Sequence, residues 1–137
     1  MRWTALAGLA AFVLIQWIPV ERANPPVESP LVAPADVEAV LRRSCYDCHS
    51  HETRWPWYSR VAPVSWWLAD HVAEAREDLN FSAWPAFDLE AQQHAFEDIR
   101  EQVSEGEMPL TSYTLLHPRA RLSATDRETL LRWAGAR

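Results

Sequence analysis

The chain has 137 residues, 48% of them hydrophobic, and a formal net charge of −6 at pH 7. This length suits a single domain, and an acidic balance without a basic stripe argues against a nucleic-acid partner. Two cysteines permit at most one disulfide. Eight tryptophans against three glycines suit either a core wrapped around a large flat apolar object or a small core short of other bulk.

The N-terminal segment, residues 1–20, is predicted to be a membrane anchor. Residues 3–20 contain no charged side chain, and this length falls within the roughly 17–25 residues that cross a bilayer. Trp3 and Trp17 stand near its two ends, where interfacial aromatic residues are common. No small-x-small cleavage site follows, so we favour an anchor over a cleaved signal peptide. Either interpretation sends the rest of the chain across a membrane.

Residues 21–35 are predicted to be a stiff, extended linker. The segment contains Pro25, Pro26, Pro30 and Pro34 and shows no hydrophobic period. We therefore expect the folded domain to comprise residues 36–137, with Asp36 as the N-cap of its first helix.

The most informative pattern is the C-x-x-C-H motif of residues 45–49, by which a haem is attached covalently to a polypeptide. The thiols of Cys45 and Cys48 would add to the two vinyl groups of one porphyrin, and the imidazole of His49 would ligate the iron. In a helix both cysteines lie on one face, with His49 one turn beyond Cys45. A thioredoxin-like pair or half a zinc site remains the alternative. Neither further ligand spacing nor a βαβ pattern supports it.

The rest of the chain is predicted to be all-α, with four helices and no strand. The first leads from Asp36 into the motif. The second runs from about Ser65 to Leu79, the third from Asp88 to just before Gly106, which suits a C-terminal cap, and the last opens with a capping-box-like start at Ser123. Their predicted apolar positions are Val37, Val40 and Leu41; Val64, Trp67, Leu68, His71, Val72, Ala75 and Leu79; Leu89, Phe96, Ile99 and Val103; and Leu130, Leu131 and Trp133.

This organisation resembles class I cytochrome c, and more closely the small membrane-anchored haem-binding domain family related to it. The resemblance covers about residues 37–134 and is carried by four stretches, 45–50, 54–58, 63–71 and 106–113. It implies a cytochrome c-like helical domain around one covalent haem c. It also implies that the first and last helices pack together, with Val40 and Leu41 against Leu130 and Trp133.

His49 is the predicted proximal iron ligand, and the sixth position has two candidates. Met108 lies in a Gly-Glu-Met-Pro loop, much as the distal methionine of class I cytochromes precedes the last helix; alternatively it is a gap-filling core residue. His71 is the rival ligand, or a hydrogen-bonded histidine on an apolar helix face. His117 is a weaker candidate.

An aromatic stretch after the motif supplies further candidates for the haem pocket. Arg54, Trp55, Tyr58 and Trp67 could line it or donate hydrogen bonds to the haem propionates. The alternative is that the aromatic residues are ordinary core and the arginine is solvated.

Together these features predict a membrane-tethered, monohaem c-type cytochrome domain on the periplasmic side of a bacterial inner membrane. It would pass single electrons between redox partner proteins and would need no catalytic residue. A soluble periplasmic form after signal cleavage is the alternative location. Two other functions remain open. One is a haem enzyme or sensor with an open sixth position for peroxide or a diatomic gas, and the other is a haem-bearing accessory subunit of a membrane redox complex.

Overall fold

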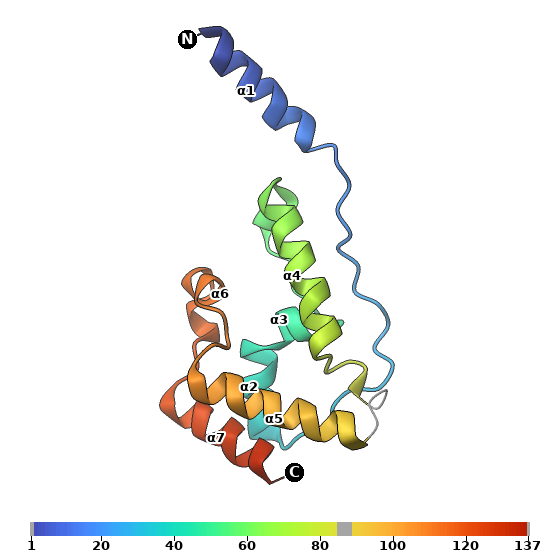
Figure 1. The fold of residues 1–137 in the computed structure, drawn as a ribbon, viewed down its shortest axis with the longest axis vertical. Helices are drawn as coiled ribbons and strands as arrows, with labels where there is room; N and C mark the ends of the chain where they lie inside the picture. Colours follow the sequence, from blue (N-terminus) through green and yellow to red (C-terminus); the bar gives the residue numbers. More distant parts are fainter. Residues whose placement is uncertain (1, 85–88, 137) are drawn as a thin grey trace.

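The computed structural model describes residues 2–84 and 89–136 and is all-α in these residues (Figure 1). Seven α-helices are present in the described part of the chain, and its β-structure amounts to one isolated bridge between Ser29 and Ala83. The helical elements are α1 (Arg2–Ile15), α2 (Ala35–Ser44), α3 (Tyr46–His49), the 3₁₀ turn η1 (Trp57–Arg60), α4 (Val64–Asp78), α5 (Leu89–Glu105), α6 (Thr111–Leu116), the 3₁₀ turn η3 (Pro118–Ala120) and α7 (Ala124–Gly135).

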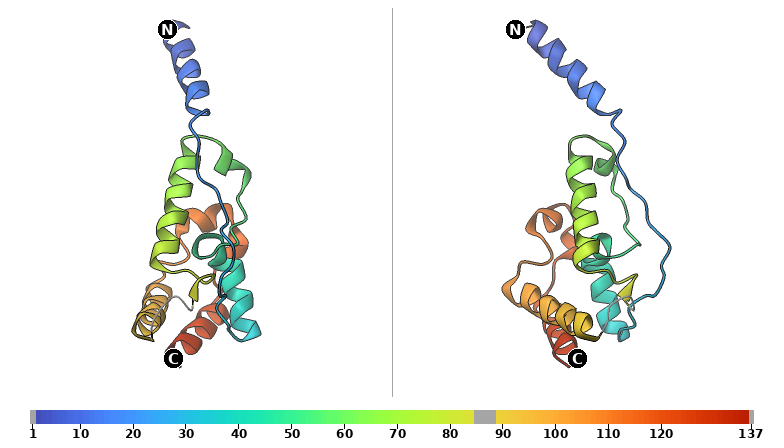
Figure 2. Two further views of the ribbon diagram at one scale, coloured as in Figure 1. Left: turned by 90° about the vertical axis from the view of Figure 1, so that its right-hand side faces the viewer. Right: turned by 45° about the vertical axis from the view of Figure 1, so that its right-hand side comes forward.

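Helix α1 projects away from the remaining helices (Figures 1 and 2) and has no buried residue. It ends at Ile15, earlier than the apolar stretch that reaches residue 20. The amide of Gln16 joins the end of this segment to the loop before α4, since its side-chain oxygen accepts from the N–H of Ala62 at 2.9 Å. Within the described residues, no helix combines the length and the apolar character needed to cross a membrane.

The segment predicted to be a linker contains no helix in residues 21–34, and it is hydrogen-bonded to the rest of the chain. Arg22 donates to the carbonyl of Ser59 at 2.9 Å and Asn24 to that of Thr53 at 2.9 Å. Further on, the N–H of Leu31 donates to Phe81 at 2.8 Å, and the Leu31 side chain is buried in the core. Figure 2 shows the segment descending alongside α4. A proline-rich segment favours an extended conformation, and these hydrogen bonds hold the segment against the helices.

The lower part of the domain is built from α2, α5 and α7. Helix α7 packs against both α5 and α2 (Figure 2), so the first and last helices of the domain meet as the resemblance implied. Their shared core contains Val37, Val40, Leu41, Ile99, Val103, Leu130 and Trp133. The burial of this face stabilises the helices, since most helical stability in proteins comes from the packing of an apolar face.

The predicted caps are confirmed at two helix ends and wrong at one. Ser123 and Asp126 form a full capping box at α7. Gly106 ends α5 with a φ of 79°, a conformation that favours glycine, and the N–H of Glu107 returns to the carbonyl of Gln102. Asp36 is not an N-cap, because α2 begins at Ala35 and its N-cap is Pro34, two residues before Asp36. The predicted start of α5 at Asp88 lies outside the described residues.

Helix α4 has nearly the predicted bounds, but its buried face differs. Val72 is buried, whereas Trp67 is 49% exposed and Val64 is 43% exposed. The main packing partners of α4 are α3 and η1. Leu89 of α5 is likewise exposed, against prediction. The short helices α3 and α6 were not predicted as separate elements.

Candidate haem-binding site

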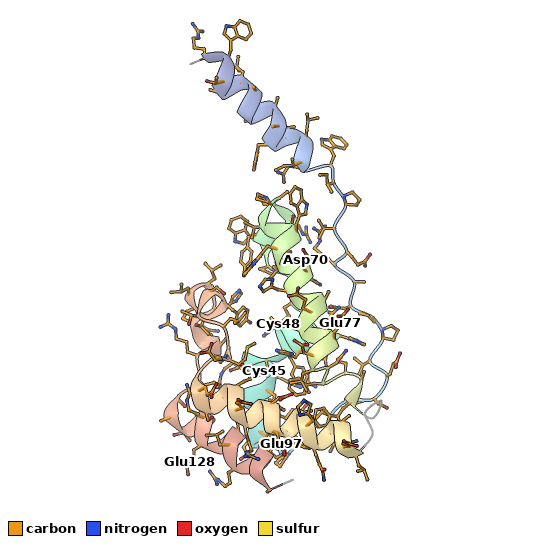
Figure 3. All side chains as sticks on the ribbon, viewed as in Figure 1. Cys45, Cys48, Asp70, Glu77, Glu97 and Glu128 are labelled. Carbon is orange, nitrogen blue, oxygen red and sulfur yellow. The ribbon has the colours of Figure 1, made fainter. Side chains whose placement is uncertain are left out.

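The motif of residues 45–49 lies where α2 gives way to α3. The N–H of Cys45 still donates to Leu41 at 2.8 Å, and its carbonyl then accepts from the N–H groups of Cys48 and His49 at 3.1 and 3.0 Å. Cys45 is thus both the C-cap of α2 and the N-cap of α3. Both cysteines are free thiols, and Figure 3 shows them close together near the middle of the domain, between α4 and α5.

Burial keeps both thiols protonated. It raises the pKa of Cys45 to about 12, with the neighbouring Cys48 as a second cause, and the pKa of Cys48 to about 11, with Asp47 as a second cause. Net addition of each thiol across a porphyrin vinyl group would conserve atoms, since the sulfur and the hydrogen would both end in the product.

The imidazole of His49 is held by the C-terminal end of α4. Its Nδ1 lies 2.8 Å from the carbonyl oxygen of Ala75 and 3.1 Å from that of Leu79. Carbonyl oxygens only accept, so the proton is on Nδ1 and the lone pair of Nε2 is free. Burial lowers the pKa of His49 and favours the neutral ring. A neutral imidazole with its second nitrogen hydrogen-bonded is the usual form of an iron or zinc ligand.

A second layer of contacts supports this histidine. The N–H of Phe81 donates to the carbonyl of His49 at 2.8 Å, and the Phe81 ring lies edge-on to the imidazole with centroids 6.3 Å apart. Phe81 also stacks on Tyr46 at 5.3 Å and is only 1% exposed. The motif is therefore anchored directly to the core.

A pocket lies beside Cys48, and three of the predicted haem-contacting residues line it: Arg54, Trp55 and Tyr58. Its other walls include Leu68 and Val72 of α4. The indole Nε1 of Trp55 is buried and has no hydrogen-bond partner among the described residues. A buried donor without an acceptor is costly unless a ligand supplies one.

These residues fit a haem. Two free thiols at the required spacing match the vinyl groups, and the Nε2 of His49, which has no hydrogen-bond partner among the described residues, matches the iron.

The remaining predicted residues lie apart from this pocket. Trp67 and His71 pair with each other on α4, with ring centroids 4.1 Å apart and the His71 Nδ1 3.0 Å from the carbonyl of Trp67. Met108 is half-buried in the loop between α5 and α6, where its N–H donates to Gln102 at 3.3 Å. Among the described residues, no interaction joins Met108 or His71 to His49.

The pocket also contains Asp47 and Tyr113, which the sequence did not single out as site residues, and His117, which it gave as a weaker candidate ligand. The hydroxyl of Tyr113 donates to Asp47 Oδ2 at 2.7 Å, and Arg54 donates to Asp47 Oδ1 from its Nε at 3.1 Å. His117, which stacks on Tyr113 at 4.5 Å, meets the Tyr58 hydroxyl at 2.7 Å through its Nε2. The sequence signal that could have revealed Tyr113 and His117 as neighbours is their spacing. They are four residues apart and therefore share a helical face.

An all-α domain whose C-x-x-C-H motif presents two free thiols and an oriented imidazole belongs to the class of helical haem-binding proteins. More particularly, the chain belongs to the haem-binding domain family, whose family model matches residues 10–136. Searches of curated proteins and of solved structures returned no significant match.

Proposed function

We propose that the protein is a monohaem c-type cytochrome domain that carries single electrons. Cys45 and Cys48 would hold the haem through two thioether bonds, and His49 would be its proximal ligand. The observation that carries this proposal is the orientation of His49, whose Nδ1 is bonded to Ala75 and Leu79 so that Nε2 is free. Haem supplies reversible one-electron chemistry at its iron when bound; the protein residues attach it, orient it and exclude water.

We further propose Met108 as the sixth ligand, with His71 as the alternative. Met108 is held in a short loop between two helices, and a thioether ligand raises the reduction potential relative to a second histidine. The Nδ1 of His71 is engaged by Trp67, although its Nε2 is not. Arg54, Trp55 and Tyr58 would contact the haem or its propionates from the pocket beside Cys48.

The location and partners are also proposals. The uncharged residues 3–20 favour a tether to a bacterial inner membrane, with the haem domain in the periplasm, where c-type haem is attached. The packing of α2 against α7 supports a relation to class I cytochrome c. The acidic net charge suits redox partner proteins with basic surfaces.

A pyridine haemochrome spectrum of the full chain, expressed with haem-attachment machinery, tests the core of this proposal. We expect a c-type spectrum with one haem per chain that survives denaturation and acid–organic extraction. The double variant Cys45→Ala/Cys48→Ala should lose all extraction-resistant haem. Extraction-resistant haem in the double variant, or its absence from the unmodified chain, would refute covalent attachment at this motif.

A second candidate, a haem enzyme or sensor with an open sixth position, is favoured by one observation. Tyr58 and His117 form a hydrogen-bonded pair in the wall of the pocket that contains Cys48, where they could donate to a bound gas or peroxide. Carbon monoxide separates the two functions. Rapid stoichiometric binding to the reduced protein at neutral pH indicates an open site, and resistance indicates a six-coordinate electron carrier.

A further inference from the structure

Helix α6 is tied to the haem-attachment motif by a hydrogen bond between residues far apart in the sequence. Tyr113 is in the middle of α6, and its hydroxyl donates to Asp47 Oδ2 at 2.7 Å. Asp47 stands between Cys45 and Cys48. A residue within the attachment motif therefore holds the helix that follows Met108.

Asp47 is well suited to this role because its carboxylate is largely buried and has several donors. Its side chain is 14% exposed, and its Oδ1 accepts from the backbone N–H of Arg54 at 3.2 Å and from the Arg54 Nε at 3.1 Å. Burial, followed by the hydrogen bond to Asp47, raises the pKa of Tyr113, so the phenol stays protonated and remains a donor.

The loop that carries Met108 is short and is fixed at both ends. On its N-terminal side, the N–H groups of Glu107 and Met108 donate to the carbonyl of Gln102 at the end of α5. On its C-terminal side, α6 begins at Thr111 and reaches Tyr113 within one turn. With α5 held, the position of Met108 depends on where Tyr113 is anchored.

We propose that the Asp47–Tyr113 hydrogen bond is a latch that holds α6 and the Met108 loop against the haem-attachment motif, which would make Asp47 and Tyr113 positioning residues for Met108 as the sixth iron ligand. This inference rests on the proposed function. The hydrogen bond restricts the position of α6, and through α6 it restricts the C-terminal side of the Met108 loop. A ligand on a preformed loop forms its bond to iron without a further ordering cost.

The hydrogen bond between Tyr58 and His117 is a second attachment of α6. It joins the C-terminal end of α6 to η1, and neither of its residues belongs to the motif of residues 45–49. Its loss should loosen the far end of α6 and leave Asp47 and Tyr113 joined. Comparison of the variant Tyr58→Phe with Tyr113→Phe therefore separates the effect of losing the attachment to η1 from the effect of losing the attachment to the motif.

The test uses the full-length, haem-loaded protein and the variants Tyr113→Phe and Asp47→Asn. The matched control is Ser123→Ala, which removes a hydroxyl–carboxylate hydrogen bond of the same length, 2.7 Å, from the distant α7 cap. Two quantities are measured: the rate of cyanide binding to the ferric protein, which requires the distal side to open, and the temperature at which the Met–iron absorption band disappears relative to the far-UV unfolding transition.

We expect Tyr113→Phe and Asp47→Asn to bind cyanide about tenfold faster, since a hydrogen bond to a charged group is removed. Their Met–iron band should disappear well below the unfolding transition. In Ser123→Ala the two transitions should move together and the cyanide rate should stay unchanged. Tyr113→Phe with the rate and band of the unmodified protein would overturn the latch.

The latch and the proposed function fail in different ways. If the unmodified protein holds haem but shows no Met–iron band, Met108 ligation is wrong and the cyanide rates alone decide on the latch. If no haem is attached, the proposed function fails, and hydrogen exchange decides instead. Amides of α6 should then lose protection in Tyr113→Phe but not in Ser123→Ala, and equal protection would refute the latch.

Discussion

The imidazole Nδ1 of His49 lies 2.8 Å from the backbone carbonyl oxygen of Ala75, in the last turns of α4. Because a carbonyl can only accept, this contact assigns the ring proton to Nδ1 and leaves Nε2 for a metal. It also fixes the ring plane, as hydrogen bonds to metal-bound histidines generally do. Helix α4 thus orients the residue on which the haem proposal depends.

Removal of this imidazole should abolish normal haem binding. We expect His49→Ala to lower the yield of stoichiometric, low-spin haem protein by at least about tenfold, since the loss of even an outer-shell contact to a metal ligand costs that much. Haem content per chain and the Soret spectrum measure the effect. His94→Ala is the control, because His94 is exposed on α5 and only pairs with Asp98 at 3.7 Å. Equal haem yields from both variants would contradict the assignment of His49.

The two candidates for the sixth ligand give opposite results on substitution. If Met108 ligates the iron, Met108→Ala loses the Met–iron charge-transfer band of the ferric protein and gains rapid carbon monoxide binding when reduced. His71→Ala keeps the band, because His71 would then only pack on Trp67. Absorption spectra of the two purified variants decide between them, and a band that persists without Met108 excludes it as the ligand.

The thiols of Cys45 and Cys48, which are partly buried, should react slowly before haem is attached. Since burial raises the pKa of Cys45 to about 12 and that of Cys48 to about 11, the haem-free protein should be alkylated by iodoacetamide with a half-maximal rate near pH 11 or above. The same protein in denaturant should reach half-maximal rate near pH 9, the ordinary thiol value. Mass spectrometry measures the alkylation rates. If the pH profiles of the folded and the denatured protein coincided, the pKa values of the two thiols would not be raised by folding.

The same shifts make the haem-free fold less stable at alkaline pH. Between pH 9 and the raised pKa values, the unfolded chain has lost protons that the folded chain still holds. The free energy of unfolding is therefore fully retained below pH 9 and falls as the pH rises through 11 and 12. Denaturant titrations at pH 8 and pH 10.5 measure this decrease.

Phe81 should be among the most costly residues to truncate. It is 1% exposed, it stacks on Tyr46, and its N–H supports the carbonyl of His49. Phe81→Ala should lower the free energy of unfolding by about 3–5 kcal/mol, through lost burial and the cavity left behind. Leu115→Ala, at a position that is 66% exposed, should change it by less than about 0.5 kcal/mol. Denaturant unfolding of both variants tests the difference.

Local features of the fold followed from the sequence because they depend on neighbours along the chain. The capping box of Ser123 and Asp126 and the left-handed Gly106 each need only residues within one helical turn. The bounds of α4 were predicted to within one residue for the same reason. Its buried face was not, because the exposure of Trp67 depends on which elements pack against α4.

The sequence by itself determined the chemistry that the chain offers: two thiols and an imidazole in the order and spacing of a haem-attachment motif, within a set of helices marked by their own caps and periods. Only the tertiary structure decided how that chemistry is held. The contacts of His49 with Ala75 and of Asp47 with Tyr113 join residues 26 and 66 positions apart. Such pairs are selected by close packing of the whole chain, which no local pattern encodes.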